Sequence, residues 1–163
     1  MASISDPFVQ EMLSGRYIAS LATGKEDGSI HLVAVWFLSE GANVYVATSS
    51  RTRKARNLVS NSKVSLMIDS RDPAASRGIT ITGTAQLLTG AASVEWNKKI
   101  HVKYLSDAAL ADPRVGPVFA AWDDVTIQIT PQPIITWDMR EIDRQVFGGA
   151  MEKNPDYLLP VER

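Results

Sequence analysis

Short β-rich segments separated by tight turns are the feature that most constrains the fold of this sequence. Segments 17–23, 30–39 and 44–48 are rich in β-branched and aromatic residues, and glycine-containing turns at 24–28 and 40–43 separate them. Connections this short join only antiparallel neighbours, because two parallel strands need a crossover of about a dozen residues or more. We therefore expect consecutive antiparallel hairpins in this part of the chain.

The remaining sequence adds further strands to this sheet and several helices beside it. Apolar residues alternate over 64–69 and 79–88, and two more strands are expected at 125–130 and 134–138. Helices are expected at 7–14, from residue 50 or 52 to 61, at 91–105, and at 106–121, where two prolines interrupt the pattern. Six or seven mostly antiparallel strands with a few helices predict a mainly β fold, a small barrel decorated by helices.

The composition indicates one globular domain. The chain has 163 residues, of which 45% are hydrophobic and 21% are charged, and its formal net charge is −1. This balance does not indicate a nucleic-acid or anionic membrane partner. The lack of cysteine excludes disulfides, iron–sulfur clusters and cysteine nucleophiles. No apolar run is long enough to cross a membrane and no signal peptide is recognisable, so we expect a soluble, cytoplasmic protein.

The sequence lacks the common motifs of catalytic and nucleotide-binding sites. It contains no G-x-G-x-x-G after a strand, no Walker loop and no G-x-S-x-G elbow. Its two histidines, His31 and His101, are far apart, and each is interpreted as a packed or surface residue. Asp123 and Asp124 are interpreted as solvated turn residues. No metal site is expected, and no catalytic acid or base can be named.

A basic, hydroxyl-rich segment follows the third expected strand. Thr48 ends the strand, and Ser-Ser-Arg-Thr-Arg-Lys-Ala-Arg then leads from Ser49 to Arg56 into a helix. Free N–H groups and the positive dipole end of a helix favour an anion, and the side chains add donors and charge. The segment therefore suits a terminal phosphate monoester. The alternative is that Ser50 or Thr52 only caps the helix and the basic residues form a solvated face.

An apolar run at 32–37 is the second candidate for a binding function. It reads Leu-Val-Ala-Val-Trp-Phe, and the simplest interpretation is a strand in the wall of a barrel. A flat aromatic ligand could also lie against it, with backbone groups contacting the polar edge of the ring. Trp137, just beyond a strand, could cover such a ring or pack in the core or an interface.

Between Leu32 and Asp69 the sequence resembles the pyridoxamine-phosphate-oxidase-like split-barrel family of flavin and deazaflavin proteins. The resemblance rests on a strand ending in Val-Ala-Thr, the following Ser-Ser-Arg-Thr-Arg-Lys-Ala-Arg-Asn-Leu, and the later Asn-Ser-Lys-Val-Ser-Leu. The segments 79–85 and 131–138 resemble later strands of this family. The most specific part is the stretch from Arg53 to Leu58.

The resemblance implies a six- to seven-stranded antiparallel split β-barrel that forms a homodimer with two cofactor sites at the subunit interface. It divides the chain into a flavin-binding domain at 1–138 and a tail at 139–163, which packs on the barrel or on the partner subunit. Residues of the basic segment would bind the cofactor phosphate, the run at 32–37 would line the isoalloxazine, and Trp137 would reach the cofactor from the partner. The implied cofactor-binding residues are Leu32, Val33, Ala34, Val35, Trp36, Phe37, Ala47, Thr48, Ser49, Thr52, Arg53, Lys54 and Trp137.

Two departures from the family pattern argue against vitamin B6 oxidation. Gly78 stands where the true pyridoxamine-phosphate oxidases carry a glutamine that contacts the flavin. The segment 140–144 lacks the Arg-Leu-His pattern with which those enzymes bind substrate. The resemblance is closer to the branch that uses FMN or the F-420 deazaflavin.

The leading hypothesis is therefore an FMN-dependent oxidoreductase that moves hydride or electrons between a reduced nicotinamide donor and a small planar acceptor. One alternative replaces FMN by the F-420 deazaflavin within the same class of enzyme. A second alternative is a flavin-binding or storage protein without turnover. A third, haem binding on the same barrel, would need an axial ligand, for which His31 and His101 are the available histidines.

Overall fold

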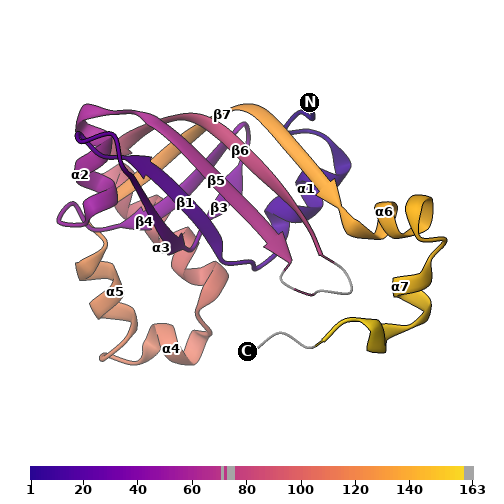
Figure 1. The fold of residues 1–163 in the computed structure, drawn as a ribbon. Helices are drawn as coiled ribbons and strands as arrows, with labels where there is room; N and C mark the ends of the chain where they lie inside the picture. Colours follow the sequence, from indigo (N-terminus) through magenta and orange to yellow (C-terminus); the bar gives the residue numbers. More distant parts are fainter. Residues whose placement is uncertain (71, 73–75, 160–163) are drawn as a thin grey trace.

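The computed structural model of the chain describes residues 1–70, 72 and 76–159 (Figure 1). Its centre is one curled sheet of seven strands in the order β2-β1-β5-β6-β7-β4-β3, and every strand pairing is antiparallel. The predicted mainly β, split-barrel fold is therefore confirmed. The strands are β1 (Ala19–Gly24), β2 (Ile30–Val35), β3 (Leu38–Glu40), β4 (Asn43–Thr48), β5 (Lys63–Ser70), β6 (Arg77–Leu88) and β7 (Val125–Asp138).

One strand expected at 30–39 is in fact two, because the chain leaves the sheet at Trp36 and Phe37. Strands β2 and β3 lie at opposite edges of the sheet, so these residues carry the chain across the barrel. Tyr104 holds the crossing: its hydroxyl donates to the Tyr17 carbonyl at 2.7 Å and accepts the Phe37 N–H at 3.4 Å. Phe37 is wholly buried.

The two strands expected at 125–130 and 134–138 are one continuous strand, β7. Pro131 and Pro133 do not break it, although proline cannot donate to a strand ladder. The β6–β7 register shifts between Ile81 and Gly83, and Gly83 then pairs with Pro131. A Cβ on Gly83 would lie 2.4 Å from the Thr130 carbonyl oxygen, so only glycine allows this close approach.

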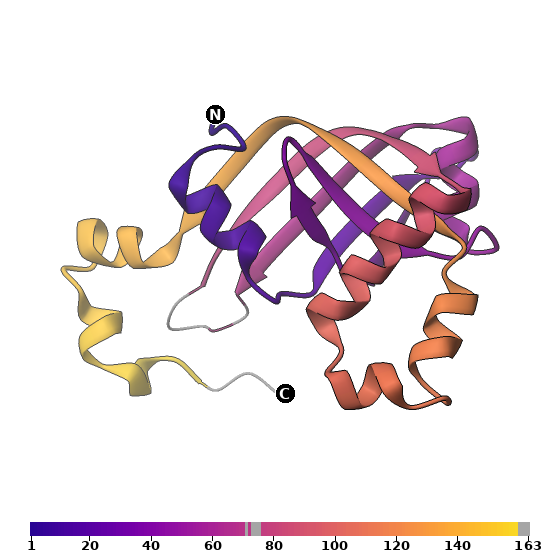
Figure 2. The ribbon, with the colours of Figure 1, turned by 180° about the vertical axis from the view of Figure 1, so that it is seen from behind.

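Helices cover one side of the sheet and one end of it (Figure 2). The first, α1, begins as expected, with Pro7 in its first turn and the Asp6 carboxylate accepting the Phe8 N–H at 3.0 Å. The predicted interrupted stretch at 106–121 is two short helices. The helices up to β7 are α1 (Pro7–Ser14), α2 (Arg53–Ser60), α3 (Gly90–Tyr104), α4 (Asp107–Ala111) and α5 (Gly116–Trp122).

The hydrophobic core lies inside the curl of the sheet, and α1 closes one side of it. Fully buried side chains come from both halves of the chain, from α1 to β7. The largest of them are Phe37, Met12, Leu13, Leu21, Leu66, Ile68, Ile79, Ile81, Ile127, Ile129 and Ile134.

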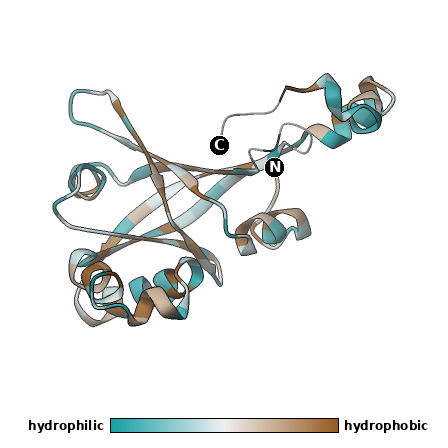
Figure 3. Cartoon of the chain, turned by 90° about the horizontal axis from the view of Figure 1, so that it is seen from below, coloured by the Kyte–Doolittle hydropathy of each residue, from teal (hydrophilic) through white to brown (hydrophobic). Residues whose placement is uncertain are grey.

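After β7 the chain forms α6 (Met139–Val146), α7 (Ala150–Lys153) and a short 3₁₀ helix, η2 (Pro155–Tyr157), which stand apart from the sheet (Figure 3). Buried Asp143 ties this tail together, because its carboxylate accepts the N–H groups of Met151 and Glu152, both at 3.0 Å. Packing of the tail on a partner subunit stays a prediction, and residues 160–163 of the expected tail lie outside the described residues. Within the described residues, no helix combines the length and the apolar character needed to cross a membrane.

Candidate functional site

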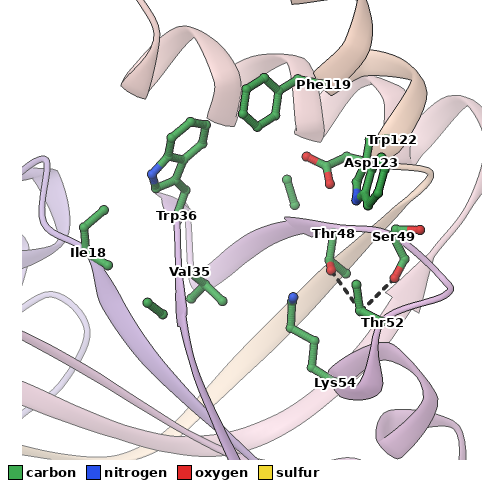
Figure 4. A pocket seen from close by; sticks show the side chains of 12 residues that line it. Ile18, Val35, Trp36, Thr48, Ser49, Thr52, Lys54, Phe119, Trp122 and Asp123 are labelled. Carbon is green, nitrogen blue, oxygen red and sulfur yellow. Dashed lines mark hydrogen bonds between the residues drawn. The ribbon is translucent and has the colours of Figure 1, made fainter. Parts of the chain in front are cut away.

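A cavity of about 360 Å³ opens where the ends of β2 and β4, the start of α2 and the helix α5 meet (Figure 4). It brings together much of the apolar run and most of the basic segment that the sequence singled out. The predicted residues that line it are Ala34, Val35, Trp36, Ala47, Thr48, Ser49, Thr52 and Lys54. Further lining comes from residues that the sequence did not single out for a cofactor: Ile18, Phe119, Trp122 and Asp123.

One end of the cavity is built for an anion. Helix α2 begins at Arg53, and the N–H groups of its first residues have no partner inside the helix. The Thr52 hydroxyl caps the helix, donates to the Ser49 carbonyl at 2.8 Å and lies 3.1 Å from the Thr48 hydroxyl. Hydroxyl groups, free N–H groups and the positive end of the helix dipole thus converge at one point.

The ammonium group of Lys54 points into the same cavity (Figure 4). Burial lowers the pKa of Lys54, and the negative charge of Asp123 partly opposes this shift. A partly desolvated ammonium is stabilised by an anionic ligand, because the ligand replaces the lost hydration. The residues present therefore fit the phosphate of a nucleotide-like cofactor.

The loop before α2 is held from the other side of the cavity. The Ser50 backbone N–H and hydroxyl donate to the two carboxylate oxygens of Asp124, each at 2.6 Å. These two hydrogen bonds lower the pKa of the Asp124 carboxyl. Since Asp124 lies between α5 and β7, the anion-binding loop and the α5 wall of the cavity are fastened to each other.

Aromatic rings form the other end of the cavity. The Trp36 ring stacks on Tyr104, with centroids 5.1 Å apart and planes 2° apart, and on Phe119 at 5.3 Å. Trp122 lines the opposite side, with the Arg51 guanidinium 5.5 Å from its ring centre. This wall suits a flat, largely apolar ring system, with the charged group of the same ligand directed toward Lys54.

Asp123, in the cavity wall, pairs with His101 of α3, which lies behind it. The Asp123 carboxylate oxygen Oδ2 lies 2.8 Å from His101 Nε2, and the histidine is only 4% exposed. The interpretation of Asp123 as a solvated turn residue is therefore wrong, and His101 is packed against a carboxylate partner that the sequence does not reveal. No signal in the spacing could have found the pair, because the two residues meet only where α5 folds back along α3.

The remaining predicted site residues do not line this cavity in the structure, which contains one copy of the chain. Leu32 is 66% exposed on the outer side of β2, Val33 packs against the core, and Phe37 is wholly buried. Arg53 points to a separate surface cavity that also contains Lys25. The structure therefore separates Arg53 from Lys54, two neighbours that the sequence assigned to one phosphate.

Trp137 lies at the opposite end of β7, where its ring covers Gly78. A Cβ on Gly78 would lie 2.4 Å from Trp137 Cζ2 and 2.6 Å from the Ile68 carbonyl oxygen. A glutamine, as expected in a true pyridoxamine-phosphate oxidase, has no room there. The role predicted for Trp137 concerns a partner subunit, so it stays a prediction. Within residues 1–70, 72 and 76–159, no three His, Cys, Asp or Glu residues come together to hold a metal ion.

Comparisons with known proteins agree with this architecture. A family model described as pyridoxamine 5'-phosphate oxidase matches residues 5–133. Among solved structures, the chain is similar to the conserved hypothetical protein Rv2991 from Mycobacterium tuberculosis, at 22% identity and a TM-score of 0.69, with 85% of this chain and 87% of that chain covered. No curated protein matches the sequence.

Two further solved structures differ in what they are described to do. A protein described as an F420 reductase is 21% identical, with a TM-score of 0.62 and coverage of 77% of this chain and 94% of that chain. HutZ from Vibrio cholerae, described as a heme storage protein, is 18% identical, with a TM-score of 0.61 and coverage of 80% and 92%. At these identities the similarities establish the fold alone.

Proposed function

The chain belongs to the pyridoxamine 5'-phosphate oxidase family, and from this premise we propose that it is an oxidoreductase that binds FMN in the cavity between β2, β4, α2 and α5. The observation that carries the proposal is the match between the two ends of the cavity and the two ends of FMN. Lys54, hydroxyl groups and a helix N-terminus offer a phosphate site, and an aromatic wall offers a place for a flat ring.

When bound, the flavin supplies hydride and electron transfer, here between a reduced nicotinamide donor and a small planar acceptor. The chain itself binds the cofactor and shields its ring from water. Lys54 and the first turn of α2 hold the phosphate, and the loop carrying Ser49 and Thr52 is fixed by Asp124 before any ligand arrives. Trp36 and Phe119 exclude water from one face of the ring.

The F-420 deazaflavin is the second candidate cofactor. It offers a phosphate and a related flat ring to the same features of the cavity. One observation favours it, namely the similarity to the fold of a protein described as an F420 reductase. The two cofactors differ in their absorption spectra and in the reactivity of their reduced forms with oxygen. A titration of the purified protein with each compound, followed by absorption, decides between them.

Haem binding and flavin storage are the competing functions. One of the similar structures is described as a heme storage protein. Here, however, Nε2 of His101 is engaged by Asp123 at 2.8 Å, which disfavours it as an axial ligand. Flavin storage uses the same cavity, and it is distinguished by the lack of reduction when NADPH or NADH is added to the loaded protein.

We further propose that the functional unit is a homodimer. This proposal is supported by the resemblance of the sequence and by apolar side chains on an edge strand, where Ile30 is 65% and Leu32 is 66% exposed. In such a dimer the outer face of β2 is covered by a second copy of the chain.

The phosphate assignment is tested by Lys54→Ala, Arg53→Ala and Arg56→Ala, three neighbouring cations of α2. We expect Lys54→Ala to weaken FMN binding about 10- to 100-fold, because one charge-assisted hydrogen bond contributes about 1.5–3 kcal/mol. Arg53→Ala should have a smaller effect and Arg56→Ala almost none, since both side chains line the neighbouring cavity. Binding is measured from the quenching of FMN fluorescence. Unchanged affinity in Lys54→Ala would refute the assignment.

A further inference from the structure

A paired carboxylate and imidazole separate two cavities on either side of α5. Asp123 lines the cavity proposed for FMN and also a second cavity of about 330 Å³ between α3 and the α4–α5 hairpin. His101 lines only the second cavity. The pair therefore places a carboxylate in the wall of the cofactor cavity and its supporting imidazole on the far side.

The position of Asp123 is fixed by its surroundings. Oδ2 is held by His101 Nε2 at 2.8 Å, and the Asp123 backbone carbonyl accepts a hydrogen bond from the Asn97 side chain at 2.9 Å. Phe119 packs on the imidazole with ring centroids 5.5 Å apart, which leaves His101 little freedom. Asp123 Oδ1 receives no hydrogen bond from the described residues.

The charge of Asp123 is felt inside the cofactor cavity. Its carboxylate points into the cavity across from the Lys54 ammonium (Figure 4), and it raises the pKa of Lys54 against the effect of burial. Among the described residues, Lys54 is the other charged residue that lines this cavity. Asp124 is turned toward Ser50, and the Arg51 guanidinium lies 5.5 Å from the centre of the Trp122 ring. A fixed negative charge thus stands in the wall near the place proposed for the ring.

We propose that Asp123 lowers the reduction potential of the bound cofactor and that His101 is its positioning residue. This inference rests on the proposed function. Two-electron reduction of FMN adds a hydride equivalent and leaves the ring anionic or in need of a proton. A carboxylate beside the ring destabilises that added negative charge, so the reduced cofactor gives up its hydride to an acceptor more readily.

The proposal is tested on FMN-loaded protein with Asp123→Asn, which keeps the shape of the side chain and removes its charge. The midpoint potential of bound FMN is measured against a reference dye during slow reduction. We expect Asp123→Asn to favour reduced over oxidised FMN about tenfold more than the wild type does, which for two electrons is a rise of about 30 mV. Asp112→Asn, on the α4–α5 connection and outside both cavities, is the matched control.

The role of His101 is tested by a conservative and a disruptive substitution. His101→Gln retains an N–H that can reach Asp123, so bound FMN should keep the midpoint potential that it has in the wild-type protein. His101→Leu releases the Asp123 carboxylate, so the midpoint potential should differ from the wild-type value. An unchanged or lower potential in Asp123→Asn, with FMN still bound, would overturn this inference alone. Failure of the wild-type protein to bind FMN or F-420 would overturn the proposed function together with it.

Discussion

Two neighbouring residues of α3 show how burial changes side-chain chemistry at single positions. Lys103 places its ammonium 4.1 Å from the centre of the Phe37 ring and donates to the Leu13 carbonyl at 3.2 Å, and burial lowers its pKa to about 8. Burial also raises the pKa of Tyr104 to about 12. Tyr104 therefore keeps the proton that it donates to Tyr17, while Lys103 is easily neutralised.

The depressed pKa of Lys103 predicts that the protein becomes more stable as the pH rises from about 8 toward 10.5. In this window the unfolded chain binds a proton that the folded chain does not, so the free energy of unfolding increases with pH. The gain should be on the order of 1 kcal/mol, because Lys103 is only half-buried and solvent screens part of the effect. Urea unfolding at several pH values measures it.

The matched variants for this test are Lys103→Met and Lys98→Met, the latter at an exposed lysine of the same helix. The slope of stability against pH should disappear in Lys103→Met and persist in Lys98→Met. Parallel curves for the wild type and Lys103→Met would show that another group causes the pH dependence.

At the scale of elements, the loop between β4 and α2 is organised by a contact with a distant corner of the chain. Ser50 and Asp124 are separated by 74 positions, yet two hydrogen bonds of 2.6 Å join them. The loop is therefore ordered without a ligand, which would reduce the entropy lost if it binds the proposed phosphate.

Asp124→Ala should release this loop without unfolding the protein. We expect faster hydrogen exchange at the backbone amides of residues 50–52 and several-fold weaker FMN binding, because the loop must then be ordered by the ligand. Asp107→Ala, an exposed acid at the start of α4, is the control. Exchange rates that stay equal to those of the wild type would mean that α2 alone holds the loop.

Elements with local signals were predictable from the sequence, and elements fixed by distant contacts were not. Asp6 and Pro7 predict the start of α1, and the alternation of apolar residues predicts β5 and β6. The break at Trp36 was missed because Tyr104, 67 positions beyond Phe37, stabilises it. The union of two expected strands into β7 was missed because its prolines are accommodated by a bulge in β7, and this bulge depends on a close approach to Gly83, which lies far away in the sequence on β6.

The candidate site divides in the same way. The basic, hydroxyl-rich end of the cavity could be singled out as a candidate phosphate site, because one continuous segment, 47–54, supplies it. Phe119, Trp122 and Asp123 were missed, because only the return of α5 along α3 brings them to the cavity. The separation of Arg53 from Lys54 also could not be read from the sequence, since it depends on how α2 is rotated against the sheet.

At the scale of the whole molecule, the sheet is an open curl with two edges, β2 and β3. The outer side of β2 exposes Ile30 and Leu32, and the tail exposes Val146, Phe147 and Tyr157. Exposed apolar side chains on an edge strand, such as Ile30 and Leu32, favour association with another chain.

Leu32→Glu should convert a dimer of the wild-type protein into a monomer, because it places a charge in the proposed apolar interface. Sedimentation velocity measures the mass, and circular dichroism checks that the variant stays folded. Val59→Glu, at a valine of α2 that is 80% exposed, is the control and should leave the mass unchanged. A monomeric wild type, or a dimer that persists in Leu32→Glu, would show that β2 is not the interface.

The long strand β7 also determines the order in which the chain can fold. It pairs with β6 along nearly its whole length and with β4 along its first part, so it is the only described strand that connects the β2-β1-β5-β6 group to the β4-β3 hairpin. Residues 43–48 are made early, yet their partner begins at Val125. During synthesis β4 can pair early with β3, but its other edge stays unpaired until Val125–Ile129 have been made, so the sheet closes between β4 and β7 only after most of the chain exists.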